Sequence, residues 1–215
     1  MRTSNYKNCD NDYRNVSISG DRGKEANYIG ECYPDLAPKK EFWSIWHNNI
    51  GIISEEENTK YYVEEYYKQV LSKLDPSKVH HDLEDKILLC YEDPDEFCHR
   101  HIVASWIKLL FEEEVPEVKV VNNVYQEVDI KECFDDLLES IMRENTPNMR
   151  GFTSFKALRL FEEGEKLEAL AEKLEEEKKD IPLDGYYMTA AGLRVQADDA
   201  EEEYRNKKQR KRANK

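Results

Sequence analysis

The pattern of apolar and polar positions between residues 1 and 121 predicts strands alternating with helices. The run Ile87-Leu88-Leu89-Cys90 contains no polar position, which predicts a strand buried on both faces. Asp93-Pro94-Asp95 then predicts a turn. Beyond Cys98, apolar residues recur at the spacing of one helix face, at Ile102, Val103, Trp106, Ile107 and Leu110. The order strand, loop, helix is typical of an α/β fold.

Further elements follow from the same reading. Val16 to Ser19 alternates and ends at Gly20, which predicts a strand and a turn, and the loop that follows lacks the spacing of a phosphate-binding loop. Helices are expected from Phe42, over 55–74 and over 79–83, and a further strand over 118–121. The segment Thr3 to Tyr6 is short and polar. Together these elements predict an α/β fold in which strands are flanked by helices; the resemblance described below implies that the sheet is small, Rossmann-like and mostly parallel.

The C-terminal third differs in pattern. A helix face recurs from Phe134 to Ile141, and a long Glu- and Lys-rich helix is expected over 153–179, either packed on the core or serving as a dimer arm. We therefore expect an α/β domain over 1–124, a helical extension over 125–180, and a linker with a charged, disordered tail over 181–215.

Composition limits the class of protein. The chain has 215 residues, 36% of them charged, and a formal net charge of −14. It carries no apolar run of the roughly 18 residues that a membrane span needs and no apolar leader, so we expect a soluble, cytoplasmic protein. Five cysteines, an odd number, are expected to be reduced thiols.

The negative charge also limits the partners. A broad nucleic-acid surface is not expected, because backbone binding rests on positive charge. The exception is the basic tail over 205–215, for which a solvated, disordered chain end is the favoured interpretation. A protein partner or a homodimer would use the acidic helix over 153–179.

Reactive side chains gather where the strand over 87–90 stops and the next helix starts, the edge at which open α/β sheets bind ligands. Cys98 is expected at or beside the helix N-cap, where the helix dipole favours a thiolate and attracts anions. Glu92 would act as acid, base or nucleophile, and Arg100 would clamp a phosphate or carboxylate. In the alternative interpretation the corner is only structural: Cys90 is a small buried apolar group, and Arg100 pairs with Asp93 or Asp95.

A metal site is a further alternative. Cys90, Cys98, His99 and His101 offer soft ligands for zinc or iron. Zinc ligands usually come in pairs separated by two to four residues, whereas Cys98 and His99 are adjacent and would diverge on a helix. We therefore expect no metal, and the sequence requires no cofactor.

The motifs Tyr33-Pro34-Asp35-Leu36-Ala37-Pro38, Leu88-Leu89-Cys90-Tyr91-Glu92 and Phe97-Cys98-His99-Arg100-His101, in this order, resemble the domain-of-unknown-function family numbered 488, over about residues 1–121. The resemblance implies a small Rossmann-like domain in which these motifs meet at the carboxyl edge of the sheet. It implies a site built from Cys90, Glu92, Cys98, His99 and Arg100, with Ser17 and Ser19 on a neighbouring strand end. The short first strand and the loop over 20–30, which lacks the Pro-Lys-Trp-like segment of the family, depart from the pattern and leave catalytic competence open.

Three functions are compatible with this reading. In the first, Glu92, Cys98 and Arg100 are the catalytic residues of an enzyme that acts on a nucleotide or another anionic small molecule. Its ligand-binding residues would be Ser17, Ser19, Cys90, His99 and His101. In the second, the same pocket only sequesters such a ligand. In the third, the acidic helical extension makes an inhibitor-like contact with a protein.

Overall fold

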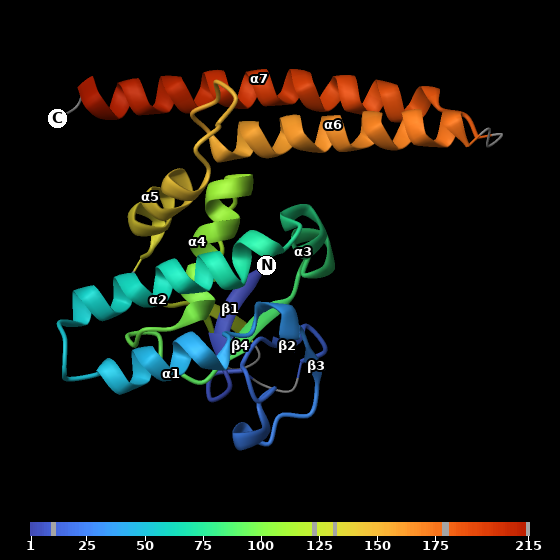
Figure 1. The fold of residues 1–215 in the computed structure, drawn as a ribbon. Coiled ribbons are helices and arrows are strands. Elements are labelled where there is room, and N and C mark those ends of the chain that lie inside the picture. Colours follow the sequence, from blue (N-terminus) through green and yellow to red (C-terminus); the bar gives the residue numbers. More distant parts are fainter. Residues whose placement is uncertain (10–11, 122–123, 131–132, 178–180, 214–215) are drawn as a thin grey trace. The chain divides into compact units, whose positions relative to one another are not determined.

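The computed structural model describes residues 1–9, 12–121, 124–130, 133–177 and 181–213. The chain forms two compact units, Met1–Asn145 and Thr146–Lys215, whose elements are shown in Figure 1.

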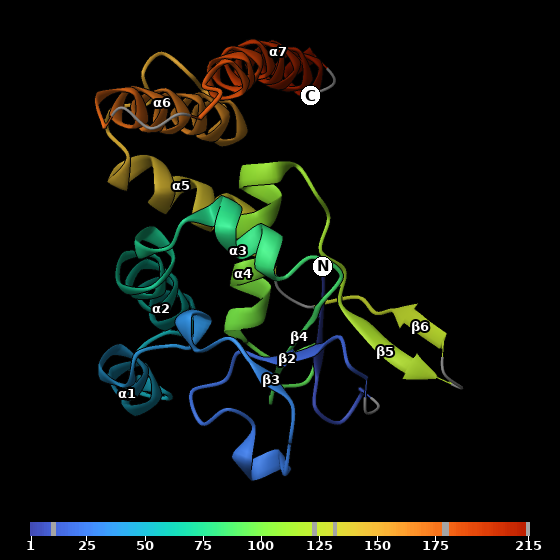
Figure 2. The same cartoon turned by 90° about the vertical axis from the view of Figure 1, so that its right-hand side faces the viewer.

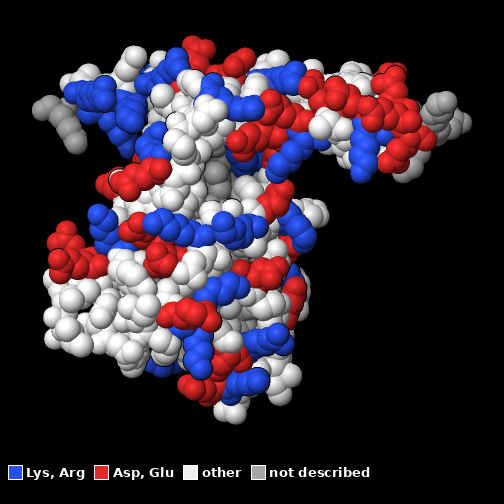
Figure 3. Space-filling view, in the orientation of Figure 1, with Lys and Arg blue, Asp and Glu red and all other residues white. Residues whose placement is uncertain are grey.

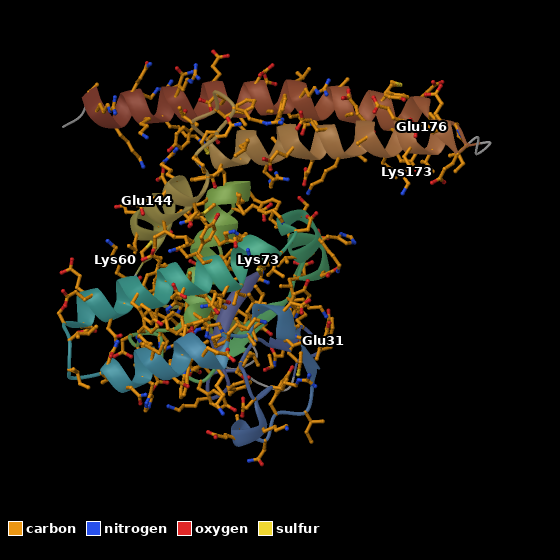
Figure 4. All side chains as sticks on the ribbon, in the orientation of Figure 1. Glu31, Lys60, Lys73, Glu144, Lys173 and Glu176 are labelled. Carbon is orange, nitrogen blue, oxygen red and sulfur yellow. The ribbon has the colours of Figure 1, made fainter. Side chains whose placement is uncertain are left out.

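The first unit contains a parallel sheet of strands β1 (Arg2–Asn5), β2 (Asn15–Ser17), β3 (Glu31–Cys32) and β4 (Ile87–Cys90), in the order β1-β4-β2-β3. All three neighbouring pairs are parallel, so every strand ends at the same edge. On edge strand β3, Glu31 (labelled in Figure 4) accepts a hydrogen bond from Lys86 Nζ at 2.6 Å. The predicted α/β class is confirmed.

Strand β1 forms although its sequence is polar. Its residues Arg2 to Asn5 pair in register with Ile87 to Cys90. The Ser4 hydroxyl donates to the Val118 carbonyl at 2.6 Å, and Thr3 and Ser4 are buried. This strand looked nearly missing in the sequence because it lacks apolar side chains. Hydrogen bonds from its polar side chains to main-chain carbonyls stabilise it instead.

The two faces of β4 are covered by different elements. Ile87 and Leu89 pack with Val118 and Tyr125 of the antiparallel hairpin formed by β5 (Val118–Val121) and β6 (Val124–Glu127). The other face turns Cys90 toward helix α4 (His99–Phe111). Figure 2 shows the hairpin on one side of the sheet and α4 on the other. The expected burial of β4 on both faces is confirmed.

The remaining helices of this unit are α1 (Lys40–Asn49), α2 (Glu55–Gln69), α3 (Pro76–Asp82) and α5 (Asp135–Asn145). Short 3-10 turns occupy Lys24–Ala26, Pro34–Leu36 and Leu71–Lys73. Helix α2 begins where the Ser54 side chain accepts from Glu57 N. It ends earlier than the periodicity to residue 74 predicts, because Val70 leaves helical geometry (φ −120°, ψ −74°).

The second unit is an antiparallel pair of helices, α6 (Phe155–Glu176) and α7 (Asp184–Ala213). Ala157 and Leu160 of α6 pack with Ala197 and Ala200 of α7. A Cβ on Gly164 would lie 3.0 Å from the Ala190 carbonyl oxygen, so the helices approach closely. The backbone N–H groups of Thr153 and Ser154 each donate to Glu201 at 2.8 Å, near the start of α6.

Helix α7 corrects the expectation of a linker and disordered tail over 181–215. The alanines that recur along α7 give no clear signal in the sequence. They form a face of small residues that is buried where α7 packs against α6. Figure 3 shows the basic side chains gathered toward the C-terminal end of α7.

The ends of the predicted helix and tail, at 178–180 and 214–215, lie outside the described residues. Among the described helices, none is both long and apolar enough to cross a membrane.

Candidate functional site

A cavity of about 710 Å³ opens at the carboxyl edge of the sheet. Its chemically reactive lining comes from the end of β4 and the start of α4, and consists of Cys90, Glu92, Cys98 and His99. The other walls come from the loop after β2 and from α1 and α2, and include Ser19, Gly20, Asp21, Glu25, Lys40, Trp43, Trp46 and Tyr62. The structure thus brings five of the predicted site residues into one pocket, namely Ser19, Cys90, Glu92, Cys98 and His99.

Two thiols, an imidazole and a carboxyl group are in contact there. His99 Nδ1 lies 3.7 Å from Cys90 Sγ and 3.9 Å from Cys98 Sγ. Cys98 Sγ is hydrogen-bonded to Glu92 Oε2 at 3.0 Å. The ligand atoms of Cys90, Cys98 and His99 all lie within 4.8 Å of one another, so the three could hold a metal ion.

The backbone at the start of α4 explains this convergence. Cys98 is the N-cap, as predicted, and has extended geometry (φ −148°, ψ 140°), whereas His99 is the first helical residue. Their side chains therefore do not follow the 100° step of neighbouring helical positions and can meet the same group.

His99 is oriented by the neighbouring strand end. Its Nε2–H donates to the Ile18 carbonyl at 3.0 Å, and its ring packs edge-on against Tyr66. With the Nε2 hydrogen committed to Ile18, Nδ1 is the nitrogen that faces both sulfurs.

Burial and mutual charge perturb these groups strongly. Burial works to raise the pKa of the Cys98 thiol, but the hydrogen bond from Cys90, the charge of Arg100 and His99 outweigh it and hold this pKa well below its usual range. The pKa of Cys90 is raised by its hydrogen bond to Cys98 and by burial. Burial and the charge of Cys98 raise the pKa of Glu92 to about 7. The pKa of His99 is raised because its hydrogen bond to Cys98 outweighs burial. The arrangement favours a Cys98 thiolate beside an imidazolium.

Arg100 and His101 do not line the pocket. Arg100 is completely buried, and its Nε and Nη2 each donate to Glu117 at 3.1 Å. His101 Nε2 lies 3.3 Å from the same carboxylate. Arg100 therefore neither clamps a ligand in this pocket nor pairs with Asp93 or Asp95. It acts on the site only through its charge.

The two predicted serines have different positions. Ser19 lines the pocket, and its hydroxyl accepts from Gly23 N at 2.9 Å and donates to Asp21 Oδ1 at 2.9 Å. Ser17 is buried behind it, hydrogen-bonded to Tyr6 at 2.7 Å. Ser17 supports the loop and Ser19 borders the pocket.

Several lining residues escaped the sequence reasoning. Asp21, which accepts a hydrogen bond from the Tyr91 hydroxyl at 2.6 Å, follows β2 at the same sheet edge and could have been found by its position. Trp43, Trp46 and Lys40 belong to α1, and no local signal shows that this helix packs beside the end of β4.

Comparison with known families supports the resemblance. Residues 11–109 match the family DUF488-N3a, described as the active DUF488-N3 subclade. The DUF488 resemblance indicated by the Cys90-Tyr91-Glu92 and Cys98-His99-Arg100-His101 motifs is thereby confirmed, over a range narrower than the 1–121 expected. Searches of curated proteins and of solved structures gave no significant match to this chain.

Proposed function

We propose that this protein is an enzyme that transforms a small molecule with a flat ring, of nucleoside type, in the pocket at the carboxyl edge of the sheet. The observation that carries the proposal is that one pocket contains both the Cys90–Glu92–Cys98–His99 cluster and an aromatic wall. Its volume of about 710 Å³ lies in the range of small-molecule sites.

The aromatic wall supports a ring-bearing substrate. The rings of Trp46, Tyr62 and Phe97 pack against one another with centroids 4.9 to 5.3 Å apart. Trp43 lines the same pocket and is 40% exposed. Flat heterocycles stack on exposed aromatic faces of this kind, and each base–aromatic contact typically contributes about 1–3 kcal/mol.

The charges of the pocket favour a nucleoside over a polyphosphate. Asp21, Glu25 and Glu92 line it, against the single lysine Lys40 among the described lining residues. Arg100, expected to hold the anion, is paired with Glu117 instead. Carboxylates suit the amino and hydroxyl donors of a base and a ribose better than they suit phosphates.

The reactive cluster supports catalysis over sequestration. A pocket that only retained a ring would not need two thiols, an imidazole and a carboxyl group in contact at its base. In the proposed enzyme Glu92 transfers a proton to or from the substrate, beside the Cys98 sulfur to which it is hydrogen-bonded. That the matched family model is described as active agrees with this assignment.

The test combines binding and turnover in the same samples. Thermal unfolding of the wild type is followed against panels of bases, nucleosides and nucleotides, and products are detected by mass spectrometry. We expect a nucleoside-type compound to raise the melting temperature and to be converted. Glu92→Gln should lower the rate by about 10²- to 10⁴-fold, the usual contribution of acid–base catalysis. Cys98→Ser should abolish turnover.

Tryptophan variants test the binding mode. Trp43→Ala should weaken ligand binding about tenfold or more, the loss of one stacking contact. Ile52→Ala, which removes another exposed apolar side chain (76% exposed) of the same unit outside the pocket lining, should leave it unchanged. Binding without conversion would make the pocket a sequestering site, and no binding by any panel member would refute the proposal.

A further inference from the structure

We propose that Cys90, Cys98 and His99 bind one zinc ion through both sulfurs and Nδ1, with a fourth coordination position open to the pocket. This inference goes beyond the proposed function and does not depend on which substrate the pocket accepts. It replaces our sequence-based expectation that no metal is bound.

The distances agree with one face of a zinc tetrahedron. With Zn–S bonds of about 2.3 Å and Zn–N bonds of about 2.0–2.1 Å, tetrahedral geometry separates sulfur and nitrogen by about 3.6 Å. The two sulfur–Nδ1 distances here are 3.7 and 3.9 Å. The same geometry separates two sulfurs by about 3.8 Å, and the two sulfurs of Cys90 and Cys98 lie within 4.8 Å of each other. Shifts of a few tenths of an ångström would bring both sulfur–nitrogen pairs to this geometry.

His99 has the environment of a metal-binding histidine. Such residues donate their second ring N–H to a carbonyl or carboxylate, which fixes the ring and leaves the other nitrogen for the metal. The Nε2–H of His99 donates to the Ile18 carbonyl at 3.0 Å. Nδ1, the ligand nitrogen, faces both sulfurs.

The scaffold holds the ligands in place before a metal arrives. Cys90 is the last residue of β4, Cys98 is the N-cap of α4 and His99 is its first residue. All three side chains are buried, with 3%, 1% and 4% exposure respectively. Burial of two thiols and an imidazole in mutual contact is expected for soft metal ligands.

The donor set selects the metal. Two cysteines and one histidine prefer zinc over magnesium or calcium, which require oxygen ligands. Three protein ligands are the number found in catalytic zinc sites, whose fourth position holds water or substrate. Glu92 is hydrogen-bonded to Cys98 and lines the pocket into which that position would open. With zinc bound, Cys98 acts as a ligand and does not attack the substrate itself.

The experiment measures metal directly in the full-length chain. After purification from zinc-supplemented cultures and extensive dialysis, elemental analysis should find about one zinc per chain. Cys90→Ser, Cys98→Ser and His99→Gln should each lower this to below about a tenth. Cys133→Ser, which removes an exposed cysteine outside the cluster, is the matched control and should keep the metal.

A second readout does not depend on how the variants fold. Zinc is removed from the wild type with a chelator, and cobalt(II) is added. We expect the absorption of tetrahedral cobalt together with thiolate-to-metal charge transfer, and a melting temperature that rises with added zinc. Wild type without zinc, without a tetrahedral cobalt spectrum, or with Cys90 and Cys98 joined in a disulfide would overturn the proposal.

Discussion

Glu117 carries the carboxylate that compensates the buried positive charge of Arg100. Its carboxylate receives both hydrogen bonds of Arg100 and lies 3.3 Å from His101 Nε2. Glu117, Arg100 and His101 are 4%, 0% and 1% exposed. Removing the carboxylate leaves the buried charge of the Arg100 guanidinium without compensation in the interior.

Glu117→Gln should therefore destabilise the protein by about 3 kcal/mol, the lower end of the range for breaking a buried ion pair. Urea unfolding monitored by tryptophan fluorescence measures this change. Glu113→Gln is the matched control, because Glu113 pairs with His80 at the surface, where its side chain is 54% exposed. The control should change stability by less than about 0.5 kcal/mol. Equal effects of the two variants would contradict the assigned role of Glu117.

The same carboxylate makes stability depend on pH. Burial works to raise the pKa of Glu117, but His101 and Arg100 outweigh it and lower this pKa below the usual 4.5. A group with a lowered folded-state pKa stabilises the fold above its unfolded pKa and loses this contribution as the pH falls through the folded one. The stability difference between wild type and Glu117→Gln should be full at pH 7 and shrink below about pH 4.5. A difference that stayed constant from pH 7 to pH 3 would contradict this origin.

At the scale of elements, the β4–α4 corner and the α6–α7 pair are built on different physical principles. The corner is defined by an apolar strand followed by an N-cap in extended geometry. The helix pair is defined by small residues, since Ala157 and Ala197 are both fully buried where the helices meet. Small residues allow close backbone approach but leave no room for larger side chains.

Ala197→Leu should consequently destabilise the α6–α7 pair by about 1–3 kcal/mol, the usual cost of overpacking. Ala191→Leu places the same side chain at an exposed position of the same helix and is the matched control. Hydrogen exchange of the α6 and α7 amides should accelerate in the first variant and stay near wild type in the second. Unchanged exchange in Ala197→Leu would show that the alanine face is not a packed interface.

At the scale of the whole molecule, each compact unit has its own core. In Met1–Asn145 the core surrounds β4, and in Thr146–Lys215 it lies between α6 and α7. The proposed zinc ligands all belong to the first unit. Ligand binding stabilises the unit that contains the site.

Calorimetry of the full chain should accordingly resolve two unfolding transitions. Zinc should raise the midpoint temperature of only one of them. Ala197→Leu should lower the midpoint temperature of the other transition. The two transitions can then be assigned to their units in the full-length protein. A single transition that responds to both zinc and Ala197→Leu would mean that the units unfold together.

The sequence by itself determined the α/β class and the strand, turn and helix of the β4–α4 corner. Both depend on local signals: the apolar run of β4, the helical spacing after Cys98, and the turn between them. Because β1, β2, β3 and β4 are all parallel, their carboxyl ends meet at one edge of the sheet, where Cys90, Glu92, Cys98, His99 and Ser19 line one pocket.

Only the tertiary structure decided which way the side chains at this edge point and what covers them. Arg100 pairs with the buried carboxylate of Glu117, which lies 17 residues further along the chain. Cys98 and His99 converged because one is extended and the other helical, which their adjacency in sequence does not reveal. The aromatic wall and the helical pairing of α7 likewise depend on contacts between distant segments. Periodicity reports the local backbone, whereas these contacts are fixed by long-range packing.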